Sequence, residues 1–475
     1  MELPLSFTLQ MKELLGEKEA ALFQDSLKIP HPISIRLNQA KVNRYLPFLK
    51  VPKDSPIPWC TSGYYLPDRL TFTFDPLFHA GAYYVQEASS MFIAQILNQY
   101  VDQERDLLVL DLCAAPGGKS SLLRSLLPNN SLLVANEFVG KRAQILSENL
   151  LKWGHPDVLV TNNCASDFGQ IPHLFDVILA DVPCSGEGMF RKDQTAIEEW
   201  SLLNVDKCWR RQRDIVRDVW NSLKPGGFFI YSTCTFNAKE NEANIQWLIE
   251  EFGAESLPVD YEDDWGVTEA YQGYNQHSYH FFPYKAKGEG FFVAVLRKST
   301  QEETILGSYP KKKKKRKITA QEAINTNLFK RVASWVELTD SYELVVKEEN
   351  CFAFNKHYLP ILSLLQSKNL HLIHAGTPVA FLKGKTCVPH AALALSNLCS
   401  TNAFPTVEIA YEQAITFLRK EAIALPAMTS KGFVLVTYKG LPLGFVKHLG
   451  SRSNNLYPTS WRIRSGYTPV ELKTL

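Results

Sequence analysis

Two cysteines, Cys184 and Cys234, are the residues of this chain best suited to covalent chemistry. Cys184 ends the segment FDVILADVPC and Cys234 ends GFFIYSTC. Each segment begins with a short apolar run of the kind that forms a buried strand. In a parallel α/β sheet the carboxyl ends of such strands meet at one edge, where these sheets build their sites. We therefore expect both thiols in one crevice, one acting as a covalent nucleophile and the other helping to finish the reaction.

The segment DVPCSG, which contains Asp181 and Cys184, narrows the chemistry. It differs from the [DN]PP[YF] pattern of amino-methyltransferases because a thiol replaces the aromatic ring that stacks on a target amine. Carbon 5 of cytosine is not nucleophilic, but a thiolate that adds to carbon 6 makes an enamine that can attack a methyl sulfonium. The carbon-5 proton must then leave, so the route needs a nucleophile and an assistant. The base must also leave its stack. Asp181 is placed to face either the adenine of a cofactor or the target base.

A third apolar run, LLVLDL (107–112), leads into a glycine-rich turn before a helix. Glycines let the backbone approach a ligand, and a helix N-terminus offers free N–H groups. The turn matches neither GxGxxG nor GxxxxGK[ST]. Glu137 ends the next run and could accept both ribose hydroxyls of a nucleoside, or simply cap a helix. Loop and acid together indicate S-adenosylmethionine. The turn consists of Cys113, Ala114, Ala115, Pro116, Gly117, Gly118 and Lys119.

The elements that must position these residues alternate between strand and helix. Strand-like runs at 107–112, 131–137 and 291–298 are accompanied by DVLVTN, FDVILAD and GFFIYST, and amphipathic stretches such as VGKRAQILSENLLKWG separate most of them. This alternation predicts an α/β fold with a doubly wound, Rossmann-like sheet. The last run, FFVAVLRK, is expected to be an antiparallel strand.

The region before this sheet is expected to be a mixed α/β lead-in. PLSFTLQMKELLGEKEAALFQDSL is amphipathic and predicts a helix, HPISIRLN predicts a strand, and AGAYYVQEASSMFIAQILNQY predicts a second helix that Ser89 and Ser90 could cap. The expected division of the chain is a lead-in domain (1–95), a methyltransferase-like domain (96–300), a basic linker (301–320) and a β-rich C-terminal region (321–475).

Composition limits the classes of protein that fit. The nine cysteines include no CxxC or CxxxC pair, so no metal site is expected, and their odd number in a chain without a leader favours reduced thiols and a cytoplasmic location. No apolar run reaches 18 residues, so no membrane-spanning helix is expected. We expect five cysteines to be buried as small hydrophobic residues. They are Cys60, Cys208, Cys351, Cys387 and Cys399.

The charge is distributed unevenly along the chain. Residues 301–475 carry 23 Lys and Arg against 12 Asp and Glu, whereas residues 1–300 carry 28 against 37. A basic C-terminal part predicts a polyanionic partner such as RNA. Seven consecutive basic residues (311–317) fit a solvated linker, an RNA contact or a nuclear address. Near the C-terminus Tyr457 and Trp461 stand among basic residues, a pattern that predicts stacking on bases beside phosphate contacts. These basic residues are Lys447, Arg452, Arg462 and Arg464.

Several motifs resemble those of the Nop/Sun family of RNA cytosine-5 methyltransferases. They are FHAGAYYVQEASSM, DLCAAPGGKSS, ANE, DVPCSGEGMFRKD, YSTCTFNAKENE and GEGFFVAVLRK. They cover roughly residues 1–300, in the family's order and spacing. The C-terminal part is similar to the β-rich, PUA-like RNA-binding domain of the bacterial small-subunit ribosomal RNA methyltransferases of F type.

The resemblance implies roles that spacing alone leaves open. It implies that Cys234 is the nucleophile, that Cys184 helps to release the product, and that Asp181 contacts both the cofactor and the substrate ring. It further implies that the 113–119 loop and Glu137 hold S-adenosylmethionine, and that Lys119 points towards the active site. The sequence departs from the family where an aspartate usually follows the third strand. Cys164 stands at that place and Asp167 three residues later.

The expected function is therefore methylation of carbon 5 of a cytidine in RNA, with 16S ribosomal RNA of the small subunit as the leading substrate. The same chemistry on transfer RNA, a non-catalytic RNA-binding assembly factor and an amino-group methyltransferase are the alternatives. Arg191 and Lys192, in GMFRKD, are candidates for holding flanking phosphates. The sequence does not settle the oligomeric state, and a monomer is our expectation.

Overall fold

The computed structural model describes residues 3–47, 49, 55–300, 326–337, 340–384, 386–467, 469 and 471–475. The predicted linker (301–320), with its basic run, lies outside the described residues. Among those that are described, no helix has the length and apolar character needed to cross a membrane.

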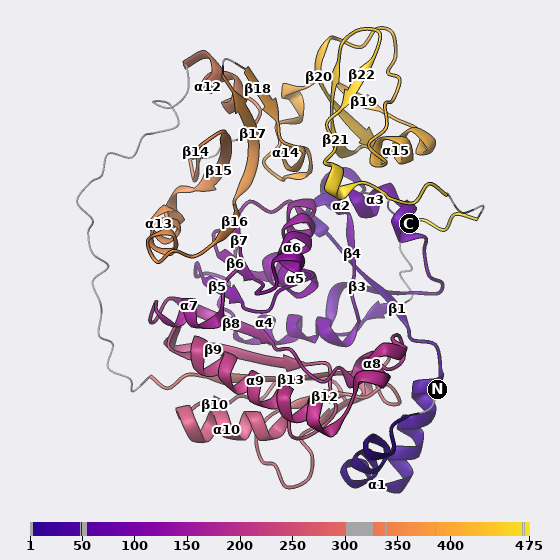
Figure 1. Ribbon diagram of the computed structural model, residues 1–475, viewed down its shortest axis with the longest axis vertical. Helices are drawn as coiled ribbons and strands as arrows, with labels where there is room; N and C mark the ends of the chain where they lie inside the picture. The colour runs from indigo at the N-terminus through magenta and orange to yellow at the C-terminus, as the bar shows by residue number, and fades with distance from the viewer. Residues whose placement is uncertain are drawn as a thin grey trace.

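A large mixed sheet forms the centre of the molecule (Figure 1). Five of its strands, β9-β8-β5-β6-β7 in spatial order, run parallel, and β13 pairs with β9 in the antiparallel direction, as the sequence predicts. From edge to edge the strands are β11 (Val267–Glu269), β12 (Tyr279–Phe281), β13 (Phe291–Arg297), β9 (Leu223–Thr233), β8 (Phe175–Asp181), β5 (Leu108–Asp111), β6 (Leu132–Asn136), β7 (Val158–Thr161) and β16 (Leu372–Ala375), while β10 (Glu255–Ser256) pairs with β13.

Helices cover both faces of this sheet, which confirms the doubly wound arrangement. Along β5, Val109 faces one apolar core whereas Leu108 and Leu110 face the other, because successive side chains of a strand point to opposite sides. The first core contains α4 (Ile93–Tyr100), α5 (Gly118–Leu126) and α6 (Gly140–Trp153), and the second contains α7 (Ala165–Gly169), α9 (Leu202–Trp220), α10 (Glu242–Phe252) and α13 (Leu359–Ser367).

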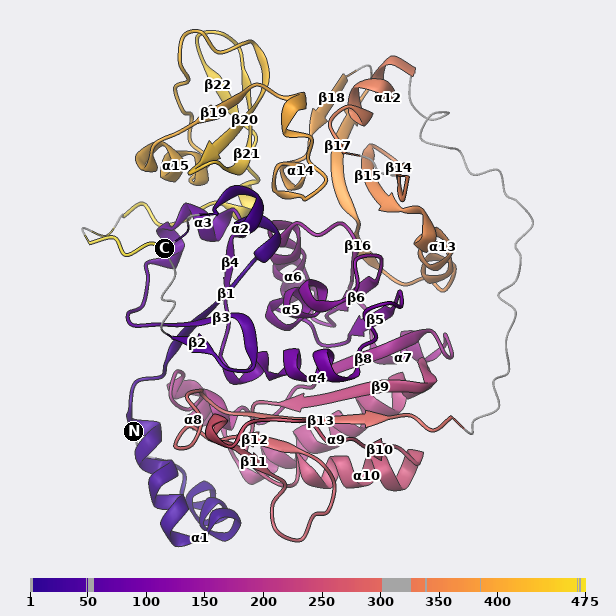
Figure 2. The ribbon, with the colours of Figure 1, turned by 180° about the vertical axis from the view of Figure 1, so that it is seen from behind.

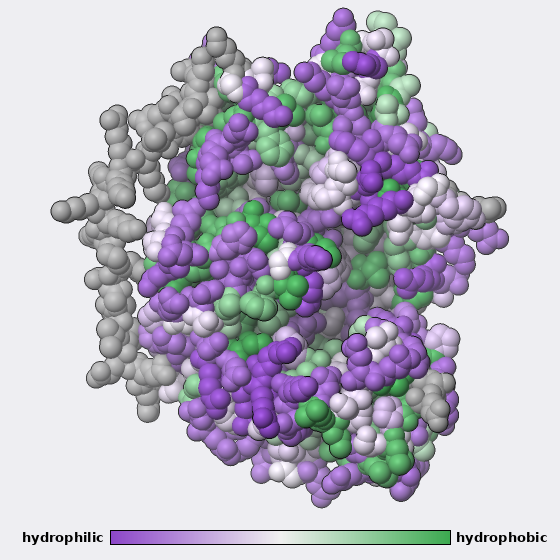
Figure 3. All heavy atoms as spheres, viewed as in Figure 1, coloured by the Kyte–Doolittle hydropathy of each residue, from purple (hydrophilic) through white to green (hydrophobic). Residues whose placement is uncertain are grey.

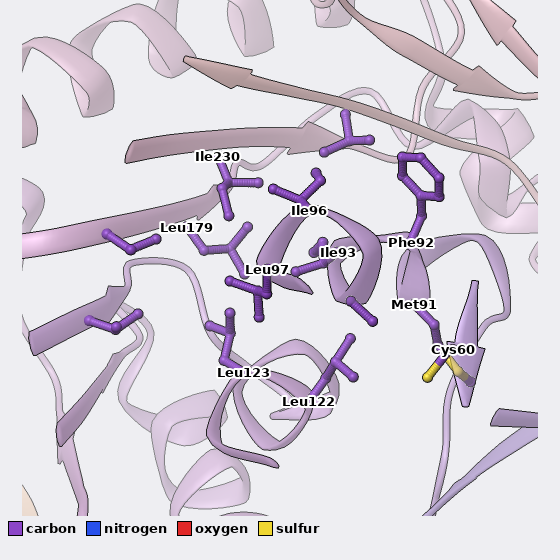
Figure 4. Packing of buried hydrophobic residues seen from close by; sticks show 14 of the residues in the cluster. Cys60, Met91, Phe92, Ile93, Ile96, Leu97, Leu122, Leu123, Leu179 and Ile230 are labelled. Atoms are coloured by element: carbon purple, nitrogen blue, oxygen red, sulfur yellow. The ribbon is translucent and has the colours of Figure 1, made fainter. Parts of the chain in front are cut away.

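The N-terminal lead-in forms a small antiparallel sheet and shares a core with the central sheet. In Figure 4, Cys60 and Met91 of the lead-in lie at one end of a cluster that continues through α4 and α5 to Leu179 and Ile230 of the central sheet. The predicted boundary at residue 95 therefore falls inside α4. The small sheet has the order β2 (Pro56–Ile57), β3 (Cys60–Leu66), β1 (Ile33–Leu37), β4 (Tyr83–Val85), and α2 (Gln39–Tyr45) and α3 (Pro76–His79) accompany it.

Two local predictions in the lead-in need correction. The predicted first helix, α1 (Leu5–Lys28), is interrupted at Gly16, whose φ of 77° is non-helical. The second helix begins later than expected, because β4 and a 3₁₀ turn precede α4. The hydroxyls of Ser89 and Ser90 do not cap it. Instead the carboxylate of Glu87 accepts the backbone N–H groups of both serines, at 2.9 and 2.7 Å, since it can satisfy two free donors at once.

The C-terminal part contains two further four-stranded sheets, seen from behind in Figure 2. The predicted hairpin at 432–447 is confirmed as β20–β21, and its two-residue turn has positive φ at both Lys439 and Gly440, as a type I′ turn requires. The strands are β14 (Tyr342–Lys347), β15 (Asn350–Asn355), β17 (Thr377–Lys383) and β18 (Thr386–Pro389), then β19 (Thr406–Glu408), β20 (Gly432–Tyr438), β21 (Leu441–His448) and β22 (Ser453–Asn455).

The C-terminal part is not separate from the central sheet. β16, which belongs to this part in sequence, pairs with β7 and forms the outer strand of the central sheet. Leu362 and Leu365 of α13 are buried in the same core as α9 and α10. Segments from both halves of the chain thus build one apolar core, and the C-terminal lobe lies beyond the sheet edge that β16 closes (Figure 1).

Candidate active site

The two predicted thiols lie together at the carboxyl edge of the central sheet. β8 and β9 run parallel with Asp181 beside Ser232, so the chain passes the same edge just before each cysteine. The Sγ atoms of Cys184 and Cys234 are 3.3 Å apart, and the Cys234 N–H donates to Cys184 Sγ at 3.4 Å. Both residues are half-buried.

The thiols of this pair have different electrostatic surroundings. The hydrogen bond with Cys234 and burial raise the pKa of Cys184 well above its ordinary value, so this thiol keeps its proton at neutral pH. The five cysteines expected to be structural, Cys60, Cys208, Cys351, Cys387 and Cys399, are all buried and free, which confirms that prediction.

Asp181 and Lys119 form an ion pair at the same edge. Lys119 Nζ lies 2.9 Å from Asp181 Oδ2, and the Ser232 hydroxyl donates to Asp181 Oδ1 at 2.8 Å. Burial lowers the pKa of Lys119, but the nearby charges of Asp181, Cys234 and Asp111 outweigh it, so its pKa lies above the ordinary value. Lys119 is therefore a fixed cation near the thiols.

The glycine-rich loop runs from the end of β5 to the first turn of α5. Gly117 is the N-cap of α5 and has φ of 113°, a conformation that L side chains rarely adopt. The loop carbonyls are held from outside, since Arg142 donates to Ala115 O at 3.0 Å and Asn149 to Pro116 O at 2.8 Å. Burial raises the pKa of the Cys113 thiol. This thiol therefore keeps its proton at neutral pH and is not a candidate nucleophile.

Two buried acids border the loop, and sequence reasoning identified only one of them. Glu137 follows β6 and accepts the Val139 N–H at 2.9 Å, but the N-cap of α6 is Val139 and no side chain of the described residues caps that helix, so Glu137 is not its N-cap acid. Asp111 ends β5. Its Oδ2 accepts the Ser120 hydroxyl at 2.6 Å, but its buried Oδ1 has no partner among the described residues. Burial raises the pKa of Asp111 to about 7. The signal that could have identified Asp111 is its position as the one acidic residue of LLVLDL, directly before the glycine-rich loop.

Cys164 and Asp167 were the two candidates for the missing acid after β7. The Asp167 carboxylate accepts the Cys164 N–H at 3.0 Å, so it caps its own helix, α7. The Cys164 thiol is exposed at the N-cap of α7. One carboxylate oxygen of Asp167 is therefore used to cap α7, and Cys164 offers a thiol in place of an acid.

Arg191 and Lys192, the candidates for flanking phosphates, are engaged within the protein. The Arg191 guanidinium donates to three carbonyls, those of Ile29, Pro30 and Gly288, at 2.9 to 3.2 Å. Lys192 Nζ lies 2.5 Å from Glu289 Oε2. These contacts tie the loop after Cys184 to Ile29 and Pro30 of the lead-in and to the segment just before β13.

The C-terminal basic residues divide into two places. Lys447 and Arg452 belong to β21 and the turn before β22, whereas Arg462 and Arg464 alternate with buried residues in the segment after Tyr457. Within the described chain none of the four forms a salt bridge. The prediction that Tyr457 and Trp461 stack on bases is wrong, because both rings are buried in the core of this lobe.

The family descriptions that match the chain cover three regions. "16S rRNA methyltransferase RsmB/F" matches residues 94–297, "N-terminal domain of 16S rRNA methyltransferase RsmF" matches residues 3–88, and "Methyltransferase RsmF PUA domain" matches residues 404–463. With the doubly wound sheet and the loop after β5, they define the class: the protein is an S-adenosylmethionine-dependent methyltransferase with a C-terminal PUA domain.

Curated relatives refine this class to a family. The chain is 32% identical to ribosomal RNA small subunit methyltransferase F of Aeromonas hydrophila, over 85% of this chain and 84% of that one. It is 31% identical to the protein of that name from Erwinia tasmaniensis, over 96% of both, and 30% identical to that of Escherichia coli K12, over 96% of this chain and 95% of that one. The chain belongs to the ribosomal RNA small subunit methyltransferase F family.

Solved structures resemble a little under two thirds of the chain. A methyltransferase homologue from Pyrococcus horikoshii shares 28% identity with a TM-score of 0.51, over 62% of this chain and 94% of that one. NSun6 from Pyrococcus horikoshii, solved with SFG, has the same TM-score at 20% identity over 62% of this chain and 98% of that one, which shows a shared fold.

Proposed function

We propose that this enzyme methylates carbon 5 of a cytidine in 16S ribosomal RNA through a covalent adduct on Cys234. The observation that carries the proposal is the pair of sulfur atoms 3.3 Å apart at the ends of β8 and β9. One thiol can attack the base while the second acts on the same ring. An amino-group methyltransferase has no use for such a pair.

The residues divide the reaction as follows. The Cys234 thiolate adds to carbon 6, forming an S–C bond and placing the electron pair of the 5,6 double bond on the ring. S-adenosylmethionine supplies the methyl group that carbon 5 then takes. Loss of the carbon-5 proton to a base returns its electron pair to the 5,6 bond and expels Cys234 as thiolate. Cys184 is next to this bond and assists the release.

Lys119 brings a positive charge near Cys234. No histidine neighbours Cys234 in the sequence, but the Lys119 ammonium interacts electrostatically with its sulfur. A nearby cation favours the charged form of a thiol. Asp181 holds this ammonium in place and, with one oxygen bound to Lys119 and the other to Ser232, faces the place where the cytosine would lie.

The residues around the glycine-rich loop fit S-adenosylmethionine. The unpartnered buried oxygen of Asp111 needs a donor, which the amino group of the cofactor offers. The N-terminus of α5 offers free N–H groups to a carboxylate. Glu137, at the end of β6, is the acceptor for the ribose hydroxyls. Cys113 to Lys119 complete the cradle.

The substrate proposal follows the names of the relatives reported above, which are small-subunit ribosomal RNA methyltransferases. It places the enzyme in the cytoplasm, acting as a monomer on the small subunit or its RNA. Naked 16S RNA, assembled 30S subunits and bulk transfer RNA, each incubated with the protein and labelled S-adenosylmethionine, separate the possibilities. We expect label in 16S RNA. Label confined to transfer RNA would overturn the choice of substrate, and no label in any RNA would favour a binding factor.

A further inference from the structure

Two buried glutamates, Glu187 and Glu240, connect the loops that carry the two thiols. Glu187 lies three residues after Cys184, yet its Oε2 accepts backbone N–H groups of the other loop, from Phe236 at 2.7 Å and Asn237 at 3.1 Å. Its side chain is fully buried. The loop after Cys184 thus holds the loop after Cys234.

Glu240 makes the reverse connection. It follows Cys234 in sequence, and its Oε2 accepts the Ser185 N–H, directly after Cys184, at 3.0 Å. The same oxygen accepts Gln212 Nε2 at 2.7 Å, and Gln212 also donates to Pro183 O at 3.0 Å. Glu240 therefore holds Ser185 directly and Pro183 through Gln212 of α9.

Asn237 joins the two carboxylates into one network. Its Nδ2 donates to Glu187 Oε1 at 3.0 Å and to Glu240 Oε1 at 2.8 Å, and its Oδ1 accepts the Glu240 N–H at 2.9 Å. Among the described residues, every hydrogen bond to either carboxylate comes from an N–H donor, including the Trp200 indole on Glu187. Only an acceptor with two oxygens satisfies such a set, since an amide would turn its own N–H groups towards donors.

We propose that Glu187 and Glu240 are positioning residues, each of which places the thiol of the opposite loop. Glu240 sets Cys184, and Glu187 sets Cys234. This inference rests on the proposed two-thiol chemistry, because it assigns each glutamate to a different step. Loss of the Glu240 contacts displaces the thiol that assists release, whereas loss of the Glu187 contacts displaces the thiol that attacks.

The test uses Glu187→Gln and Glu240→Gln, alone and combined with Cys184→Ala, and measures the RNA–protein adduct on denaturing gels with 30S subunits and 16S RNA. We expect Glu240→Gln alone to raise the adduct fraction at least threefold over wild type, but to change it little when Cys184 is already alanine. We expect Glu187→Gln to slow adduct formation about tenfold in the Cys184→Ala background. Such dependence on background is a coupling that general loss of stability does not produce.

A second measurement needs no RNA. Dibromobimane bridges neighbouring thiols, and peptide mass spectrometry reports the yield of the Cys184–Cys234 bridge. We expect this yield to fall in both glutamine variants. Gln212→Met removes the donations to Pro183 O and to Glu240 Oε2. It should share the Glu240 phenotype in milder form and serves if Glu240→Gln does not fold.

Glu242→Gln is the matched control. Glu242 is equally buried and near in sequence, but it bonds His280 and Tyr271 rather than either thiol loop. It should leave the bridge yield and the adduct unchanged. Equal effects of Glu187→Gln and Glu240→Gln in both backgrounds, or an unchanged bridge yield, would overturn the inference. Absence of any adduct with Cys184→Ala alone, together with a lowered bridge yield in the two variants, would overturn the proposed chemistry and leave the placement of the thiols standing.

Discussion

Cys184 and Cys234 share one edge of the sheet, but their surroundings favour different roles. Cys184 is held protonated by burial and by its neighbour sulfur, and Cys234 lies near the Lys119 cation. A thiol that keeps its proton is a poor nucleophile, since the thiolate is the reactive form. The raised pKa of Cys184 counts against this thiol as the nucleophile, a choice that the spacing of the two cysteines left open.

The acids of the site show where sequence reasoning stops at the scale of single residues. The cysteines, the loop and Glu137 follow recognisable strand ends. Glu187 and Glu240 stand in the same motifs, but no pattern tells a buried carboxylate from a solvated one, because its partners come from a loop about 50 residues away. Sequence reasoning did not identify Asp111 for a related reason, because the last residue of a strand can face either the core or the site.

The raised pKa of Asp111 predicts a pH-dependent stability. Burial raises this pKa from 3.8 to about 7, so between these values the folded chain binds a proton that the unfolded chain has lost. The free energy of unfolding therefore falls as the pH rises through that window, by at most about 4 kcal/mol from this group. Asp111→Asn removes the titrating carboxyl group. In urea unfolding, the stability of this variant relative to wild type should therefore increase from pH 4 to 7. A constant difference would contradict the burial of this carboxyl.

At the scale of elements, the long buried strands were predictable and the short joining ones were not. Runs such as FDVILAD are apolar throughout because both faces of a parallel strand are covered. β16 has only four residues, all of them half-buried, and its partner β7 lies some 200 residues earlier. No local pattern in LIHA indicates that pairing. The prediction from sequence therefore treated the C-terminal region as separate from the sheet that it completes.

The turn before α5 predicts a specific cost for one methyl group. Gly117→Ala must adopt φ near 113°, and its Cβ would meet Leu146 Cδ1 at 3.3 Å. We expect the free energy of unfolding to fall by about 1–3 kcal/mol and S-adenosylmethionine to bind more weakly by calorimetry. Gly253→Ala, at the end of α10 with open space around it, should lose stability but keep its affinity. Equal cofactor affinity in both variants would remove Gly117 from the site.

At the scale of the whole molecule, the C-terminal lobe lies beyond the β16 edge of the central sheet. The helices α1 and α10 lie towards the opposite end of the molecule (Figure 1). Figure 3 shows the same face with a hollow near its middle, surrounded largely by hydrophilic residues. Residues 376–475, which follow β16, carry 11 Lys and Arg against 4 Asp and Glu. We infer that the lobe contributes phosphate contacts and leaves base recognition to the methyltransferase part.

The salt dependence of RNA binding tests this division. Lys447→Ala with Arg452→Ala removes two exposed cations that form no salt bridge with the described residues. If both contact phosphates, the slope of log affinity against log salt should become shallower by about one per contact. Lys356→Ala with Lys368→Ala, exposed residues beside α13, is the matched pair and should leave the slope unchanged. The same loss in both pairs would indicate a diffuse charge effect rather than a binding face.

Release of the carbon-5 hydrogen tests the central claim most directly. 16S RNA carrying [5-³H]cytidine, naked or in 30S subunits, is incubated with enzyme and S-adenosylmethionine, and tritium in water is compared with methyl groups incorporated. Attack by Cys234 and methylation at carbon 5 predict one tritium released per methyl group, and neither event with Cys234→Ala. Methyl incorporation without tritium release, or activity that survives Cys234→Ala, would contradict the account.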